Sequence, residues 1–141
     1  MKKLFLLFAV VMSAAAVVLG ADELPPVISV SDSARGQGES IVMAIQAGDY
    51  RQFLQAANEA ERNGDAEQFK RSYEKLTGSF GKITGFRFLT NLQTPLVINQ
   101  VWVLDFVKFD QQGREVRRQL LLQLLFGEQD GAMRLIGMRV I

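Results

Sequence analysis

The sequence predicts one α+β domain, in which N-terminal helices pack on one face of a curved four-stranded antiparallel meander sheet. Apolar residues recur with a helical period up to about residue 80 and with a period of two from Ile83 onward. Length supports the same class, because 141 residues that include an N-terminal targeting segment leave enough chain for one sizeable core.

Residues 1–21 are expected to form a removable secretory signal peptide. Lys2 and Lys3 make a short positive region, and an apolar run follows from Leu4 to Leu19. This run is shorter than the roughly 20 residues of a membrane span, and small residues after it favour cleavage after Gly20 or Ala21. An uncleaved membrane anchor is the alternative. We therefore expect an exported protein, periplasmic or secreted, with no membrane association after cleavage.

Residues 22–38 are interpreted as a flexible leader, and residues 39–141 as the folded domain. The leader is rich in Pro, Ser, Gly and charged residues, a composition typical of loops and linkers. Its apolar residues, Val27, Ile28 and Val30, leave open the alternative that it adds an edge strand to the sheet.

Three helices are predicted over about residues 39–47, 50–62 and 65–80. Asp49 is the expected N-cap of the second helix, because Gln52 stands in the capping-box position three residues later. The third helix carries an apolar stripe at steps of four and three residues, which predicts that it lies on a core. The stripe consists of Phe69, Tyr73, Leu76 and Phe80.

Four strands joined by short turns are predicted in the second half of the chain. The turn residues between them favour antiparallel hairpins. A two-residue or a four-residue loop at the second turn gives the same pairing, in which Asp105 opposes Arg118 and Lys108 opposes Glu115. The predicted strands are Ile83–Gln93, Val97–Phe109, Arg114–Gly127 and Ala132–Ile141.

Alternation along these strands predicts two unlike faces of the sheet. In the predicted register, the face away from the helices carries an apolar patch larger than a soluble monomer normally exposes. We expect a twofold homodimer to cover this patch, with folding back of the leader as the alternative. The expected interface residues are Trp102, Leu104, Phe106, Leu121, Ile136 and Met138.

The helix-facing side is predicted to carry one charged cluster, made of Asp105, Arg118 and Arg139. Buried charges persist when they are paired, so one interpretation is a structural ion pair at the end of the sheet. The alternative is a binding site for a small anionic ligand, because two guanidinium groups exceed one carboxylate and Arg binds carboxylates in a bidentate manner.

Composition excludes several function classes. The chain has no Cys and no His, which excludes disulfides, thiol and His-based catalysis, and Cys- or His-ligated metal sites. We expect no metal and no cofactor. Loss of Lys2 and Lys3 changes the net charge from +1 to −1, which does not suggest a nucleic-acid partner.

The order of the predicted elements, three helices and then a long curved meander, is accompanied by two local motifs. These are the Ala-Gly-Asp-Tyr junction at Ala47–Tyr50 and the final strand around Leu135–Val140. Together they resemble the small exported domains of the nuclear transport factor 2-like, cystatin-like cone superfamily. The resemblance implies a fold more than an activity, because members include ligand-binding, isomerase, dehydratase and structural modules. The Asp-His arrangement of its enzymes cannot exist in a chain without His.

The expected function is therefore that of an exported, non-catalytic binding or interaction module. Two alternatives stay open. One is a small-molecule enzyme of isomerase or dehydratase type that uses Asp105 as a pocket carboxylate. The other is a cystatin-like inhibitor domain.

Overall fold

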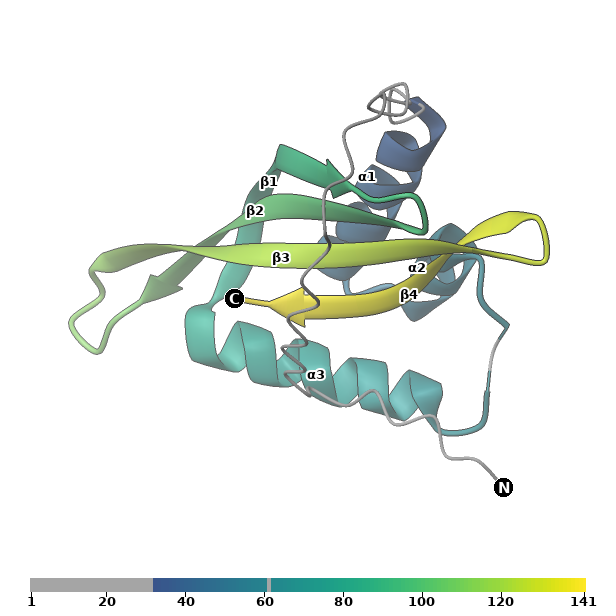
Figure 1. Cartoon of the computed structure of the whole chain (residues 1–141). Helices are drawn as coiled ribbons and strands as arrows, with labels where there is room; N and C mark the ends of the chain where they lie inside the picture. The colour runs from purple at the N-terminus through teal and green to yellow at the C-terminus, as the bar shows by residue number, and fades with distance from the viewer. Residues whose placement is uncertain (1–31, 61) are drawn as a thin grey trace.

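The computed structural model describes residues 32–60 and 62–141, and the signal peptide and most of the leader lie outside these ranges. Within them, three helices precede four strands, as predicted (Figure 1). The strands form one open antiparallel sheet in the order β1-β2-β3-β4. The elements are α1 (Asp32–Ala47), α2 (Tyr50–Ala57), α3 (Asp65–Phe80), β1 (Lys82–Gln93), β2 (Val97–Phe109), β3 (Glu115–Gln129) and β4 (Ala132–Val140).

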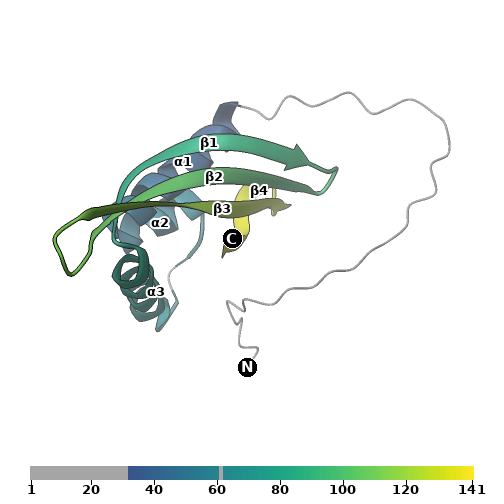
Figure 2. The ribbon, with the colours of Figure 1, turned by 90° about the vertical axis from the view of Figure 1, so that its left-hand side faces the viewer.

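The three helices lie on one side of the strongly curved sheet (Figure 2). The core fills the space between these two layers and draws on every element. Its most buried large side chains are Phe106, Phe126, Ile41, Leu104, Leu122 and Leu124. The α+β arrangement expected from the change of hydrophobic period is confirmed.

Helix α1 begins at Asp32 and not near Glu39, so its first turns occupy the end of the predicted leader. Ala34 is buried, and its carbonyl oxygen accepts a hydrogen bond from the side chain of Gln100 on β2. Gly38 is buried as well. Small residues in this segment are typical of a linker, but here they allow the helix to approach the sheet.

Helix α2 begins as predicted and ends early. The Asp49 side chain accepts a hydrogen bond from the backbone N–H of Gln52 at 3.0 Å, which confirms the N-cap. The helix stops at Ala57 because Asn58 adopts a left-handed conformation with φ 58°.

The register between β2 and β3 differs by one residue from the predicted one. Phe109 opposes Glu115, so Asp105 opposes Gln119 and Arg118 opposes Phe106. The predicted pairings of Asp105 with Arg118 and of Lys108 with Glu115 are therefore wrong.

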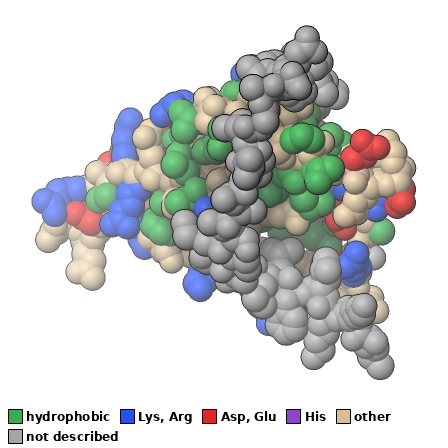
Figure 3. All heavy atoms as spheres, viewed as in Figure 1, with side chains coloured by type: hydrophobic (Ala, Val, Ile, Leu, Met, Phe, Trp, Pro, Cys, Tyr) green, Lys and Arg blue, Asp and Glu red, His purple; other side chains and the backbone are tan. Residues whose placement is uncertain are grey.

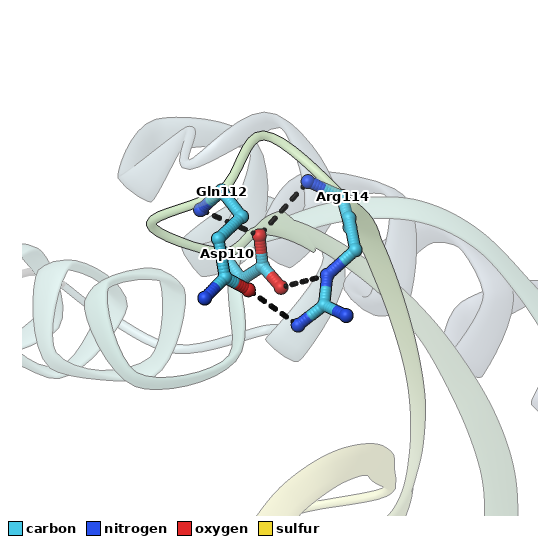
Figure 4. A network of polar contacts seen from close by, with 3 residues as sticks. All are labelled: Asp110, Gln112 and Arg114. Atoms are coloured by element: carbon cyan, nitrogen blue, oxygen red, sulfur yellow. Dashed lines mark hydrogen bonds and ion pairs between the residues drawn. The ribbon is translucent and has the colours of Figure 1, made fainter.

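The turn between these strands explains the shift (Figure 4). The Gly113 N–H donates to the Asp110 carbonyl, and Gly113 has a positive φ of 75°, which together form a type I turn followed by a bulge. Asp110 stabilises this turn, because its Oδ1 accepts hydrogen bonds from the backbone N–H groups of Gln112 and Arg114, each at 2.9 Å. An odd number of residues therefore lies between Phe109 and Glu115, which oppose each other. This shift of one residue exchanges the two faces of β2 relative to the prediction.

This inversion corrects the assignment of the two sheet faces. Trp102, Leu104 and Phe106 face the helices and are 2%, 0% and 1% exposed, so the prediction that they form an interface is wrong. Met138 also packs against the core. Of the predicted interface residues, Leu121 and Ile136 lie on the face away from the helices, which we call the outer face.

Candidate functional site

The interior between helices and sheet contains a closed polar network. Gln100 is 0% exposed and is the one buried polar or charged residue in the part of the chain that the structure describes. Its Nε2 donates to the Ala34 carbonyl at 2.7 Å, and its Oε1 accepts from Trp102 Nε1 at 3.1 Å. Both ends of the amide are thus bonded within the protein, as buried polar groups require.

Aromatic side chains occupy the rest of this interior. Phe53 and Phe69 join α2 to α3 with ring centroids 5.1 Å apart, and Phe80 packs on Phe106 at 5.8 Å. Such contacts stabilise beyond their buried area and leave these rings as parts of the core. The interior groups described so far bind one another.

The outer face of the sheet has an apolar centre. Val103 opposes Leu121 across β2 and β3, and Leu125 opposes Gly137 across β3 and β4. Ile136 is 46% exposed and lies over β3, since a Cβ added to Gly127 would be 3.1 Å from its Cδ1 atom. In the view of Figure 3, hydrophobic side chains are visible on this side of the sheet between the β2–β3 hairpin and the β3–β4 hairpin.

Polar side chains share this face with the apolar ones. The register places Arg87, Gln119, Gln123 and Arg139 among the polar residues on the outer face, with Gln123 between Leu121 and Leu125 on β3. Lys and Arg side chains gather toward the β2–β3 hairpin in Figure 3. A face that combines apolar side chains with Arg and amide groups is compatible with a protein interaction surface.

A hollow of about 910 Å³ opens near the β2–β3 hairpin, in the part of the sheet where Asp105 lies. Asp105 Oδ1 accepts a hydrogen bond from Gln119 Nε2 at 2.7 Å, and the Thr84 hydroxyl donates to the Asp105 carbonyl at 3.4 Å. The hollow is lined by Thr84, Gly85, Asp105, Phe106, Val107, Glu115, Arg117, Arg118 and Gln119.

The predicted charged cluster is divided by the observed register. Asp105 lies on the outer face and not toward the helices, and Arg139, opposite Gln123, shares that face. Arg118 opposes Phe106 and so belongs to the other side of the sheet. Asp105 and Arg118 nevertheless line the same hollow, whereas Arg139 does not. Within residues 32–60 and 62–141, none of the three forms an ion pair.

Sequence reasoning missed Val101 and Val103 as outer-face residues. Strand β2 is apolar on both sides, with Val103 only 3% exposed, so its alternation could not decide which side meets the helices. The signal that decides is Gly113 after Asp110, which favours a three-residue turn with a bulge over the even loops that we considered.

Two further features concern the described ranges alone. Among these residues no three Asp or Glu side chains come together in a way that could hold a metal ion. None of their helices combines the length and the apolar character that crossing a membrane requires.

Known proteins offer a likeness of fold. No family model matches the chain, and no curated protein matches it. An NTF-2-like protein of unknown function from Shewanella oneidensis has 17% identity and a TM-score of 0.49, covering 78% of this chain and 97% of that one. A candidate polyketide cyclase from Acidithiobacillus ferrooxidans has 12% identity and a TM-score of 0.49, covering 81% and 90%.

The association domain of CaMKII from C. elegans is a third such structure, with 14% identity and a TM-score of 0.43, covering 79% of this chain and 98% of that one. These three structures share one arrangement of elements but are described as different kinds of protein. Likeness of this kind concerns chain topology and transfers no ligand, partner or activity.

Proposed function

We propose that this chain, whose three helices and open antiparallel sheet are those of a nuclear transport factor 2-like fold, is an exported, non-catalytic interaction module. It binds through the outer face of its sheet, and its partner there is a second copy of itself. Export is supported by Lys2, Lys3 and the apolar run from Leu4 to Leu19.

The observation that carries the proposal is the contrast between the two faces of the sheet. The helix-facing side is occupied by a core whose polar network is closed on itself. The outer face keeps Ile136 46% exposed near Leu125 and has no helix over it. Apolar surface of this kind on a soluble domain marks an interaction site.

The size of the outer face suits a dimer. Strand β2 has 13 residues and the sheet has four strands, so the face is roughly 40 Å long and about 15 to 20 Å wide at the usual spacings. This is of the same order as the ~800 Å² that each partner buries in a standard interface.

A second copy also fits the chemistry of the polar residues on this face. A twofold axis sets each residue of the patch against the same patch, so the patch must complement itself. Gln119 and Gln123 can do so because a side-chain amide both donates and accepts hydrogen bonds. Arg87 and Arg139 share the face with Asp105, which supplies opposite charges for contacts between copies.

The enzymatic alternative loses the interior carboxylate on which it depended. It placed Asp105 in the interior as a general base, but Asp105 lies on the outer face and is hydrogen-bonded to Gln119. No observation in the structure favours the cystatin-like inhibitor either. The interaction module remains the function with the most support.

Sedimentation of the mature protein tests the proposal. We expect a dimer at micromolar concentration, and a monomer when Leu125→Glu and Ile136→Glu place two like charges on the outer face. The matched control is Met43→Glu, since Met43 is also an exposed apolar residue, at 53%, but stands on α1. A wild type that sediments as a monomer, or a control that dissociates as the double variant does, would contradict the proposal.

A further inference from the structure

Strand β3 extends past the end of its neighbour β4. Pairing between these two strands runs from Gln129 to Leu122, and the last hydrogen bonds join Leu121 to Ile141. The rest of β3, residues 115–120, pairs with β2 on one side only. Figure 1 shows β3 continuing beyond β4 toward the β2–β3 hairpin. Within the part of the chain that the structure describes, residues 115–120 therefore form a sheet edge without a neighbouring strand, which we call the free edge.

The hydrogen bonds at the end of β4 indicate which backbone groups the free edge presents. The Leu121 N–H donates to the Ile141 carbonyl at 3.4 Å, and the Leu121 carbonyl accepts from the Ile141 N–H at 2.8 Å. In an antiparallel ladder, successive residues direct their N–H and C=O groups to opposite sides. Gln119 and Arg117 therefore direct theirs to the same side as Leu121, where no described strand pairs with them. Unpaired groups of this kind are a template for a further strand.

Side chains on the free edge alternate in character. The register places Val116, Arg118 and Leu120 on the helix side of β3. Val116 and Leu120 are half-buried, whereas Arg118 is exposed and forms no ion pair with any described residue. On the outer face, Arg117 is already bonded to Glu115. The helix side of the free edge thus offers an apolar, a cationic and an apolar position in turn.

We propose that the free edge binds an extended peptide of a partner protein, in which alternate residues are apolar, acidic and apolar. Strands added to a sheet edge are held by main-chain hydrogen bonds and selected by their alternate side chains. An Asp or Glu opposite Arg118 would accept charge-assisted hydrogen bonds. Apolar residues two positions to either side would lie opposite Val116 and Leu120.

A second copy of the chain fits the free edge less well. If two free edges paired about a twofold axis at Arg118, like charges would lie directly opposite each other, which is destabilising. Charged side chains on an edge strand are one means by which proteins avoid such pairing. A partner of opposite charge does not meet this repulsion.

This inference goes beyond the proposed dimer and is independent of it. The dimer uses outer-face residues such as Leu125 and Ile136, which lie outside the free edge. Loss of the dimer in the double variant would leave the free edge in place, and loss of peptide binding would leave the outer face in place.

Amide NMR titration of the mature protein with synthetic peptides tests the proposal. The peptide Thr-Val-Thr-Glu-Thr-Val-Thr, blocked at both ends, carries the proposed pattern, and the same peptide with Lys in place of Glu is its control. We expect the Glu peptide to shift the amide signals of Arg117 and Gln119 saturably and to slow their hydrogen exchange. It should bind at least about tenfold more tightly than the Lys peptide. Equal binding of the two peptides, or no response to either, would overturn the proposal.

Methylation of the peptide backbone separates an added strand from a general charge contact. In the proposed pairing, the N–H of the Glu points away from β3, whereas those of the two flanking Thr residues point toward Arg117 and Gln119. Methylation of the Glu nitrogen should thus be tolerated, and methylation of both Thr nitrogens should weaken binding at least about tenfold. Equal loss from the two methylations would contradict an added strand.

Charge reversal in the protein should reverse the choice of peptide. Arg118→Glu should bind the Lys peptide more tightly than the Glu peptide, and because Arg118 is exposed the spectrum should stay dispersed. Arg51→Glu is the matched control, since Arg51 is also an exposed arginine without an ion pair in the described ranges but stands on α2. An unchanged preference in Arg118→Glu, or a reversed one in Arg51→Glu, would overturn the proposal. Amides of Arg117 and Gln119 that are protected without peptide and lose protection on dilution would assign the edge to a second copy and overturn it too.

Discussion

The close approach of α1 to the sheet restricts which residues can stand at their contact. Gly38 faces the side chain of Gln100, and a Cβ added there would be 1.9 Å from Gln100 Oε1. The same amide bonds Ala34 and Trp102, so it cannot move away without leaving a buried polar group unpaired. The glycine and the glutamine thus depend on each other.

Gly38→Ala should therefore destabilise the protein by about 1 to 3 kcal/mol, the usual cost of overpacking. Gly36→Ala is its matched control two residues earlier, because nothing lies within 4 Å of a Cβ there. In α1 the control should stabilise by up to ~1 kcal/mol through helix propensity. Denaturant unfolding measures both changes, and equal stabilisation by the two would show that α1 does not contact the sheet at Gly38.

At the scale of elements, the β2–β3 turn determines which side of β2 meets the helices. Asp110 accepts from two backbone N–H groups with one oxygen and from Arg114 Nε with the other. These hydrogen bonds hold the pKa of Asp110 below its usual value, and the bond from the Arg114 backbone N–H has the largest effect. The carboxylate form thus favours the folded turn.

The sign of this shift predicts an acid-sensitive contribution to stability. A carboxyl group with a lowered native pKa stabilises the fold above the usual Asp value of about 3.9, and that stability is lost as pH falls through the native pKa. Asp110→Asn should thus lower the melting temperature near neutral pH. The difference from wild type should shrink below about pH 4. A difference that stays constant over this pH range would contradict the assignment.

Sequence alone predicted the elements better than their faces. The strands begin and end within two residues of the predicted ones, because period-two patterning and turn residues mark them locally. The start of α1 was missed, since small residues at Ala34 and Gly38 resemble a linker until the sheet is present to meet them. The face of β2 was missed because one bulge residue, Gly113, decides it.

The same register error affected the prediction of the candidate site. A shift of one residue moved Asp105 to the outer face and placed Trp102, Leu104 and Phe106 in the core. The general expectation of an apolar sheet face without a helix over it did not depend on the register, because both sides of β2 are apolar. Its residues did.

At the scale of the whole molecule, the proposal requires export before assembly. The mature protein should begin at Ala21 or Asp22, because small residues precede both bonds. Intact mass of protein recovered from an exporting host measures this directly. A mass that still includes Lys2 and Lys3 would contradict export with cleavage.

In the proposed dimer, two copies of the chain meet at the outer faces of their sheets. Isotope-filtered NOEs from methyl groups, in a mixed sample of labelled and unlabelled mature protein, test this arrangement. They arise only between atoms of different copies that are in contact across the interface. We predict contacts from Leu121, Leu125 and Ile136, and none from Met43 on α1. Intermolecular contacts confined to the helices, or a dimer without any from these three outer-face residues, would contradict the claim.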